Sequence, residues 1–456
     1  MKADTPAFGA TARLAQFCSA LRYRDLDEAA RRAVRRHLLD TVGAAIAGTR
    51  GFPARVAART LAEIQTGGDI PVPGIDGLWG RADAAYLMGA SAHGLELDDG
   101  YRAGSVHPGA TVIPAALAAA WGQGVSGERL GAAIAAGYEV VTRVAETVHP
   151  ASRKRGFHNT SITGVLGAAA ACASVLGLDH EKTAHALGIA ASSAAGLFAF
   201  LHGGGDIKRL HPGFAAREGL FAALLARNGM TGPAGVLEIE DGFLQAFGGS
   251  TDAGRITAGL GDGFNVARCY IKPYACCRHI HPTLDALIAI AGEEGVTATD
   301  IAAIEVGTYG IAAGHAHGGW NDMPAAQMNY RFCAALAASG GRVAIPDFAD
   351  ERLGDAALGD LARRVTVTVD AACEAEYPRL RSANVVVVTR DGARHHRYVD
   401  EPLGSVRHPI SDDAVVDKFH GLASPIVGTP EAERLHAAIW SLETVPDVDT
   451  LLRAPV

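Results

Sequence analysis

Apolar residues recur at helical spacing along the first half of the chain. In the run from Asp27 to Gly48, alanine, valine and leucine share one face, basic residues lie opposite, and the run stops at glycine, which is typical of an amphipathic helix. Ala-rich segments separated by Gly, Pro and His follow. We expect further helices at 81–97, 112–123, 128–148, 163–176, 181–197 and 213–228. The first 265 residues are therefore predicted to be almost entirely helical.

The pattern changes after Arg268. The segments IAAIEVGTY, RRVTVTVD and NVVVVTRDGARHHRYV have the β-branched content of strands, and Asp391-Gly392 between two such runs predicts a hairpin. Helical spacing returns at Ser411, and Thr429 is expected to cap a last helix. The predicted fold is mainly α with an α+β part.

The predicted domains follow from this change from helix-like to strand-like residue patterns. A large all-helical domain is expected over 1–267 and 405–456, and a smaller α+β domain over 268–404. We expect the C-terminal tail to pack back on the large domain.

Composition indicates a globular protein of about two or three domain-sized units. Of the 456 residues, 48% are hydrophobic and 20% are charged, which argues against disorder. The 41 basic and 49 acidic residues give a net charge of −8, and no Lys/Arg run could track a phosphate backbone. Nucleic acid is not an expected partner.

Several features favour a cytoplasmic protein. The first residues lack a basic region followed by an apolar block, so no secretion signal is expected. The apolar stretches at 165–178 and 187–201 are shorter than the roughly 20 residues that a membrane span needs, and we expect buried helices there. Seven scattered cysteines differ from a secreted disulfide framework.

The first of four chemical clusters runs from His93 to His107. Helical spacing would bring Glu96, Asp99 and Arg102 toward one face at the end of an apolar helix. Each acid alone could equally serve as a helix cap or a salt-bridge partner, but their density beside a histidine favours a site.

The second cluster surrounds His158, just before a long Ala/Gly helix. A helix N-terminus disfavours the protonated imidazole, which suits a neutral base or a hydrogen-bond donor. The alternative is a structural histidine.

The third cluster contains Gly203-Gly204-Gly205 and Lys208. The triple glycine resembles a phosphate cradle, but the GxxxxGK[ST] pattern and a preceding strand are both absent, which excludes nucleotide binding. A lysine in an irregular loop could act as a base if desolvation lowered its pKa. The alternative is an exposed surface lysine.

The fourth cluster is Lys272–Pro282, with adjacent cysteines and two histidines. The CxxC or HxxxH spacing that lets zinc ligands converge is missing, so no metal is expected. Arg278 as a bidentate fork and Lys272 as a point charge could instead bind substrate carboxylates.

These clusters, in this order, resemble the MmgE/PrpD family, which includes 2-methylcitrate dehydratase, cis-aconitate decarboxylase and iminodisuccinate epimerase. The resemblance covers nearly the whole chain. It implies a large helical domain built from both chain ends, a smaller α+β domain, a homodimer and no cofactor. The segments that carry it are LLDTVGAAIAG, HPGATVIPAALAAA, KRLHPGFAAREGLFAALLARNGMTGP and KPYACCRHIHPTLDA.

The resemblance also implies the site residues. The family's pocket histidines fall on His107 and His158 and its pocket lysine on Lys208, and these three are the expected catalytic residues. The expected substrate-binding residues are Glu96, Asp98, Asp99, Tyr101, Arg102, Lys272, Arg278, His279 and Tyr330.

Two departures from the family pattern bear on the reaction. The family's Asp-x-Asp-Asp-Thr motif reads Glu96-Leu97-Asp98-Asp99-Gly100 here, and a tyrosine of decarboxylase members falls on Phe332. Tyr330 or Tyr101 could replace that tyrosine.

The expected activity is abstraction of a proton next to a carboxylate of a small di- or tricarboxylic acid. The leading prediction is a lyase, a hydro-lyase similar to 2-methylcitrate dehydratase. The alternative is an epimerase or isomerase of a dicarboxylate, followed by a decarboxylase and by a non-catalytic carboxylate-binding protein.

Overall fold

The computed structural model describes residues 9–64, 66–200 and 206–453, which form two compact units. The larger unit takes its described residues from Met1–Gly94, Asp98–Tyr270 and Ser411–Val456, and the smaller one comprises Leu95–Leu97 and Ile271–Ile410. The sequence places the domain boundaries after residues 267 and 404, and it assigns 95–97 to the large domain. The triple glycine and Leu201 lie outside the described residues.

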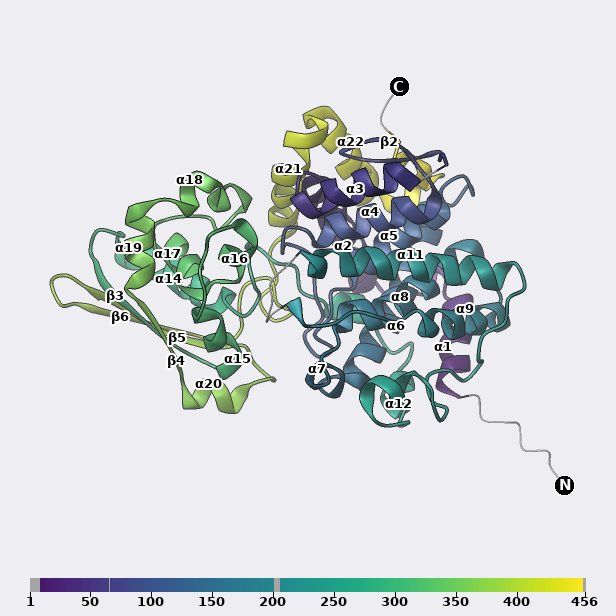
Figure 1. The fold of residues 1–456 in the computed structure, drawn as a ribbon, viewed down its shortest axis with the longest axis horizontal. Helices are drawn as coiled ribbons and strands as arrows, with labels where there is room; N and C mark the ends of the chain where they lie inside the picture. Colours follow the sequence, from purple (N-terminus) through teal and green to yellow (C-terminus); the bar gives the residue numbers. More distant parts are fainter. Residues whose placement is uncertain (1–8, 65, 201–205, 454–456) are drawn as a thin grey trace. The chain divides into compact units, whose positions relative to one another are not determined.

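The larger unit is mainly helical (Figure 1). Its helices are α1 (Ala10–Ala20), α2 (Glu28–Gly48), α3 (Phe52–Ile64), α4 (Arg81–His93), α5 (Gly109–Ala120), α6 (Gly127–Val148), α7 (Ala151–Lys154), α8 (Asn159–Leu176), α9 (His180–Ser192), α11 (Ile207–Arg227), α12 (Phe243–Gly248), α13 (Gly254–Thr257), α21 (Asp412–Val427) and α22 (Thr429–Trp440).

Helix α8 forms the centre of this unit, packed against α5, α6, α9 and α11. Glycines permit the close approach: a Cβ at Gly164 would lie 2.6 Å from Thr111 Cγ2 of α5, and one at Gly167 would lie 2.7 Å from Val141 Cβ of α6. Helix α8 is long and apolar enough to cross a membrane, but 89% of it is buried inside the protein, as expected of a core helix.

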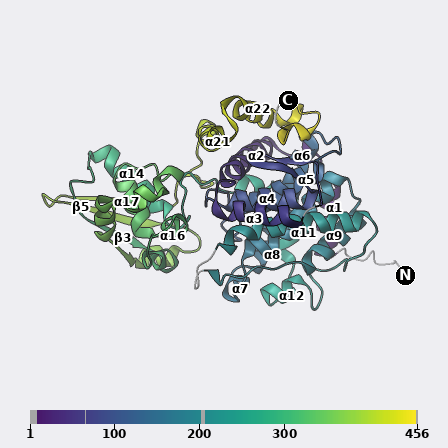
Figure 2. The ribbon, with the colours of Figure 1, turned by 45° about the horizontal axis from the view of Figure 1, so that its top comes forward.

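In the larger unit, segments from the N-terminal and C-terminal parts of the chain pack together. Figures 1 and 2 both show α21 beside α2, and the two helices pack together. Lys418 Nζ of α21 lies 2.5 Å from Asp40 Oδ1 of α2, and both Arg32 and Arg36 pair with Asp412. The contact therefore combines burial with ion pairs.

Three local predictions need correction. A short antiparallel hairpin, β1 (Ile70–Val72) and β2 (Ile75–Trp79), interrupts the helical region because Gly74, at φ +90°, turns the chain. Helix α4 ends at His93, and residues 95–97 leave the helix. Gly428, not Thr429, caps α22, because Thr429 already has helical geometry and Gly428 adopts φ +85°.

The smaller unit is α+β, as predicted. Its sheet has the order β4-β3-β5-β6, with β3 parallel to β4 and antiparallel to β5, and the predicted Asp391-Gly392 hairpin joins β5 to β6. Helix α14 packs on β5 and β6, and α17 packs on α14. The elements are α14 (His281–Glu294), β3 (Ile301–Thr308), α15 (Gly310–Ala313), α16 (Met323–Met328), α17 (Tyr330–Ala338), α18 (Asp350–Leu353), α19 (Ala356–Arg363), β4 (Val365–Val369), α20 (Ala371–Glu376), β5 (Ala383–Thr389) and β6 (Arg394–Val399).

Candidate active site

A cluster of histidines occupies the interior of the larger unit. His93 ends α4, His107 stands two residues before α5, His158 is the N-cap residue of α8, and His211 lies in α11. The ring centroid of His93 lies 5.0 Å from that of His107 and 6.1 Å from that of His158, and the His158 and His211 centroids are 5.1 Å apart. Four helices thus bring titratable rings together; we call these residues the histidine cluster.

The fully buried carboxylate of Asp98 orients two of these rings. Its Oδ2 lies 2.6 Å from His93 Nδ1 and 3.4 Å from His107 Nδ1. His107 Nδ1 also lies 2.6 Å from the carbonyl oxygen of Asp99. Because both Nδ1 atoms face oxygen acceptors, they carry the protons in the neutral rings, which leaves each Nε2 as the basic atom.

Asp99 holds the loop that carries His107. Its Oδ1 accepts from the Gly109 backbone N–H (2.9 Å), while its Oδ2 accepts from the Tyr138 hydroxyl (2.7 Å) and lies 3.0 Å from His37 Nδ1. The Asp99 carboxylate thus links the start of α5 to α2 and α6, which fixes the loop that carries His107.

Burial lowers the pKa of His158 well below its usual value, and the neighbouring groups His93, His211 and Lys208 lower it further. The imidazole is consequently neutral at pH 7, the state in which it can take up a proton or donate a hydrogen bond. The sequence-based expectation for this ring rested on its helix N-terminus. In the structure, desolvation is the larger cause.

Lys208 lies in the first turn of α11, which corrects the predicted irregular loop. Its positive charge contributes to the lowered pKa of both His158 and His211, so Lys208 lies near the histidine cluster. The structure therefore brings together the three residues expected to be catalytic: His107, His158 and Lys208.

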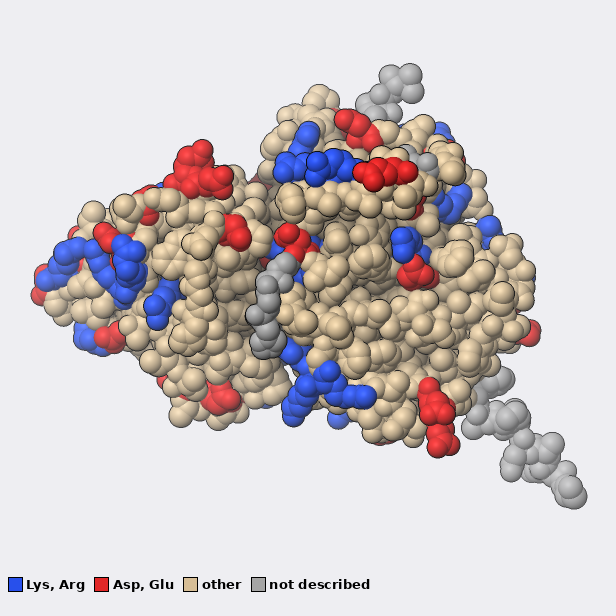
Figure 3. Space-filling view, in the orientation of Figure 1, with Lys and Arg blue, Asp and Glu red and all other residues tan. Residues whose placement is uncertain are grey.

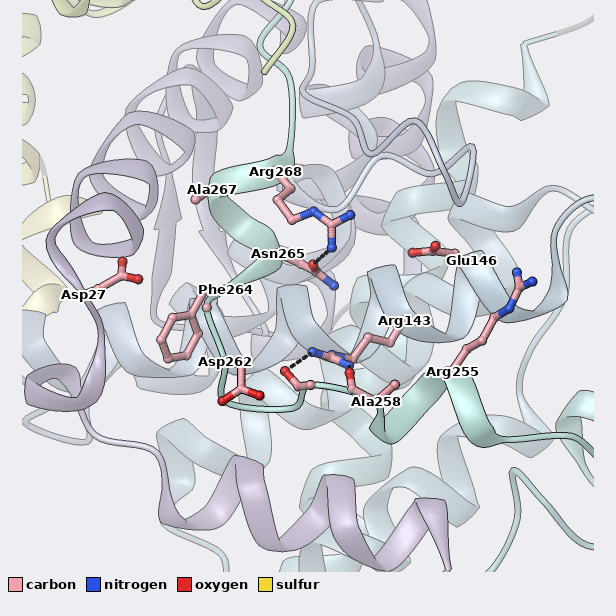
Figure 4. A pocket seen from close by; sticks show the side chains of 12 residues that line it. Asp27, Arg143, Glu146, Arg255, Ala258, Asp262, Phe264, Asn265, Ala267 and Arg268 are labelled. Carbon is pink, nitrogen blue, oxygen red and sulfur yellow. Dashed lines mark hydrogen bonds between the residues drawn. The ribbon is translucent and has the colours of Figure 1, made fainter. Parts of the chain in front are cut away.

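Two further candidates lie in the loop before α5. The Tyr101 hydroxyl donates to Glu146 Oε2 (2.6 Å), and burial raises the pKa of that hydroxyl. Glu146 lines a separate cavity of about 590 Å³ on the larger unit (Figure 4). Tyr101 is thus hydrogen-bonded to a residue of that cavity's wall. Arg102 is half-buried in the same loop.

That separate cavity does not contain the predicted site. Its most buried cation, Arg143, is bonded to Glu139 and to the backbone carbonyls of Ile256, Ala258 and Gly259. Figure 4 shows this guanidinium directed at the loop around Ala258. Its hydrogen bonds serve the fold, so we do not place the chemistry there.

In the smaller unit, Lys272 and Glu96 form a buried pair. Lys272 Nζ donates to the backbone oxygen of Glu96 (3.0 Å) and lies 3.7 Å from its carboxylate. Glu96 has φ +56°, so it does not continue α4, and the predicted helical face shared with Asp99 and Arg102 is wrong. A charged pair holds this left-handed residue in place.

Arg278 and His279 have protein partners in the same unit. Arg278 donates to the carbonyl oxygens of Leu403 and Pro402, and its Nη1 lies 2.8 Å from His281 Nδ1. His279 Nδ1 lies 2.6 Å from the Tyr309 hydroxyl. Their roles as substrate-binding groups stay predictions.

Phe332, which falls on the tyrosine of decarboxylase members, and the nearby Tyr330 are both core residues. Phe332 is fully buried and stacks on Trp320, with centroids 5.8 Å apart. The hydroxyl of Tyr330, also fully buried, lies 2.7 Å from Thr283 Oγ1, and burial raises the pKa of that hydroxyl. Any substitution of Tyr330 for the family tyrosine stays a prediction.

Ligand atoms of His93, Asp98 and His107 lie within 4.8 Å of one another, a spacing that a metal ion could bridge. Both Nδ1 atoms, however, already face protein oxygens in this arrangement. The geometry fits a carboxylate that orients two imidazoles.

Sequence reasoning did not select His93 or His211 as site residues. The available signals were their positions: His93 opens the first cluster, and His211 follows Lys208 by three residues, within one helical turn. Only the packing of α4, α8 and α11 shows that both rings join His158.

Two family models together match most of the chain. The MmgE/PrpD N-terminal domain matches residues 12–255 and the MmgE/PrpD C-terminal domain matches residues 274–444. The chain therefore belongs to the MmgE/PrpD family. Like the family as a whole, it is an enzyme that acts on carboxylic acids.

Curated relatives are similar over almost their whole length. A cis-aconitate decarboxylase-like protein of Aspergillus oryzae is 30% identical, covering 98% of this chain and 98% of the relative. The cis-aconitate decarboxylase of Aspergillus terreus is 27% identical, with 97% and 95% covered. The human cis-aconitate decarboxylase is also 27% identical, with 92% and 90% covered. These relatives are lyases.

Proposed function

We propose that this protein is a cofactor-independent lyase that acts on a small tricarboxylate through a carbanion next to a carboxylate, with decarboxylation of cis-aconitate as the first candidate reaction. The observation that carries the proposal is that His107, His158 and Lys208 come together at the histidine cluster, in which Asp98 orients His93 and His107. The coverage of decarboxylase relatives over 97–98% of the chain supports the choice of reaction.

The mechanism uses neutral imidazoles beside a cation. In decarboxylation the bond between carbon and carboxylate breaks, carbon dioxide leaves, and the electron pair stays on carbon until a proton arrives. Lys208 would stabilise the developing negative charge, since a preorganised cation in a water-poor site is effective there. His158 and Lys208 are the proposed proton donors and acceptors, and His107 is proposed to hold a carboxylate.

The charge distribution before α8 suits an anionic substrate. Figure 3 shows Lys and Arg side chains gathered over α7, where Arg153, Lys154 and Arg155 follow one another in the chain. The Arg153 guanidinium lies 3.7 Å from the centroid of the Phe198 ring, which in turn packs against His158. Such a basic patch raises the local concentration of a polycarboxylate.

The test is proton NMR in deuterium oxide with cis-aconitate, 2-methylcitrate, citrate and iminodisuccinate as separate substrates. Decarboxylation would release carbon dioxide and place one deuterium on the product. Silence across all four acids would contradict the proposed function.

Replacing either proposed acid/base residue should nearly abolish turnover. We expect Lys208→Ala and His158→Ala to lower kcat by at least about 10²-fold each while the fold is retained, because positioned acid/base groups contribute about 10²- to 10⁴-fold. Lys182→Ala, at an exposed position in α9, is the matched control. Wild-type rates in both site variants would refute the assignment.

Dehydration of a hydroxytricarboxylate such as 2-methylcitrate is the second candidate. The observation that favours it is Phe332, because a buried phenyl ring replaces the hydroxyl that decarboxylase members place there. In the same NMR experiment, dehydration would give a new alkene without release of carbon dioxide. Epimerisation of a dicarboxylate would exchange a C–H for deuterium and form the epimer, with no new alkene and no release of carbon dioxide.

We also propose that the protein is a homodimer, as the family resemblance implies. Light scattering after size-exclusion chromatography should give twice the chain mass of 47.1 kDa. A monomer mass at assay concentration would contradict this.

A further inference from the structure

His158 has one side-chain hydrogen-bond partner in the described part of the chain, and it is another histidine. His158 Nδ1 lies 2.9 Å from His211 Nδ1. Two neutral imidazoles at this distance share one proton, because one ring must donate and the other accept. The tautomer of His158 therefore depends on that of His211.

Aromatic rings cover His158 on another side. Phe198 and Phe200 meet its ring edge-on, with centroids 5.0 and 5.6 Å away, and Phe200 also lies 6.0 Å from His211. These side chains limit the access of water to His158, which is only 3% exposed. Within the part of the chain that the structure describes, His211 is therefore the group placed to exchange a proton with His158 Nδ1.

His211 also lines a small cavity of about 190 Å³. Ser161, Ser193 and Glu218 supply polar groups to the same wall, and Gly196 completes it. A Cβ at Gly196 would come within 2.5 Å of Ser161 Cβ, and the backbone there has φ +126°, so a side chain is excluded from this position. The Gly196 carbonyl accepts from the His158 backbone N–H (3.0 Å). Gly196 thus binds the His158 backbone through its carbonyl oxygen and, having no side chain, adds no bulk to the cavity wall that it shares with His211.

We propose that His211 is a positioning residue and proton relay, which connects His158 to the cavity that His211 lines. This inference rests on the proposed function. Decarboxylation consumes one proton per turnover, because carbon dioxide departs and a C–H bond replaces the C–C bond. When His158 gives its Nε2 proton to carbon, it recovers one at Nδ1 from His211, and His211 takes a proton from the cavity.

The proposed relay gives a role to His211, which has no contact with Asp98 in the described structure. His93 and His107 are oriented by a carboxylate, whereas among the described residues the Nδ1 atoms of His158 and His211 face each other. A carboxylate partner would favour the protonated state of His158, while a second imidazole leaves it neutral and still transfers protons.

The first arm of the test is chemical rescue. We expect His211→Ala to lower kcat by about 10²-fold with little change in KM, and added imidazole to restore a substantial part of the rate. His211→Asn, which can keep the hydrogen bond but cannot relay a proton, should be slow and insensitive to imidazole. His185→Ala is the matched control, because His185 sits in α9 with its Nδ1 2.9 Å from the Gly232 carbonyl oxygen.

The second arm does not depend on turnover. Ring ¹⁵N NMR of histidine-labelled protein should show a single neutral tautomer for His158 in the wild type, and a changed tautomer balance in His211→Ala. Folding of each variant is checked by circular dichroism and by the unchanged signal of His185.

The outcomes separate the two proposals. If the wild type is inert on all four acids, the proposed function fails, and the NMR arm alone decides the relay. The relay is overturned if folded His211→Asn keeps the wild-type rate, or if imidazole does not restore activity to folded His211→Ala. It is also overturned if the tautomer balance of His158 is the same in the wild type and in both variants.

Discussion

At the scale of residues, one buried carboxylate organises the site. Asp98 is fully buried, and it contacts the Nδ1 atoms of His93 and His107. The sequence identified Asp98 as one acid among several in a dense loop. It could not distinguish Asp98, which orients histidines, from Asp99, which clamps Gly109 and Tyr138, because the two side chains are adjacent in the chain and diverge only in the folded loop.

Loss of the Asp98 charge should disable catalysis more than stability. In Asp98→Asn the amide can still meet one ring but no longer favours the Nδ1–H tautomer of both, so we expect kcat to fall by about 10²-fold or more. The check is steady-state kinetics beside Asp179→Asn, which alters an exposed cap of α9. An unchanged kcat in Asp98→Asn would falsify the orienting role.

At the scale of elements, small residues set the distances between helices. The sequence predicted a long Ala/Gly helix after His158. The structure shows what this packing achieves: α5 and α6 approach α8 closely enough that His107 and His158, which stand just before α5 and α8, come into one cluster.

A single added methyl group at this contact should destabilise the larger unit. Gly167→Ala would place a Cβ 2.7 Å from Val141 Cβ and 2.9 Å from the Gly137 carbonyl oxygen, and overpacking of this kind costs about 1–3 kcal/mol. Gly421→Ala in α21 is the control, because its Cβ meets nothing within 4 Å and removing a helical glycine gains about 0.5–1 kcal/mol. Denaturant unfolding of both variants should therefore give shifts of opposite sign.

At the scale of the whole molecule, buried neutral histidines make stability depend on pH. Burial, the neighbouring His93 and Lys208 lower the pKa of His211 from 6.5 to about 4, and that of His158 is lowered as well. The unfolded chain therefore binds these protons more readily than the folded one. The stabilisation is complete above pH 6.5 and is lost as the pH falls toward 4.

The pH dependence can be assigned by comparison of variants. Between pH 7.5 and pH 4, the wild type should lose up to roughly 3 kcal/mol more unfolding free energy than His211→Asn, since one pKa unit corresponds to about 1.4 kcal/mol. Urea titrations at several pH values measure this difference. Parallel curves for the two proteins would contradict the lowered pKa of His211.

The sequence by itself determined the mainly α class, the α+β part and the family, because periodicity and local motifs are properties of contiguous segments. The three residues proposed as catalytic are what the resemblance to that family implies. The sequence misplaced some helix ends: Lys208, predicted in a loop, lies in α11, and Glu96, predicted in a helix, lies beyond the end of α4. Only the tertiary structure decided which acid orients which ring and that His211 is the partner of His158. Those relations join residues from α4, α8 and α11, and side chains so far apart in the chain meet only when the packing of helices has set their distances.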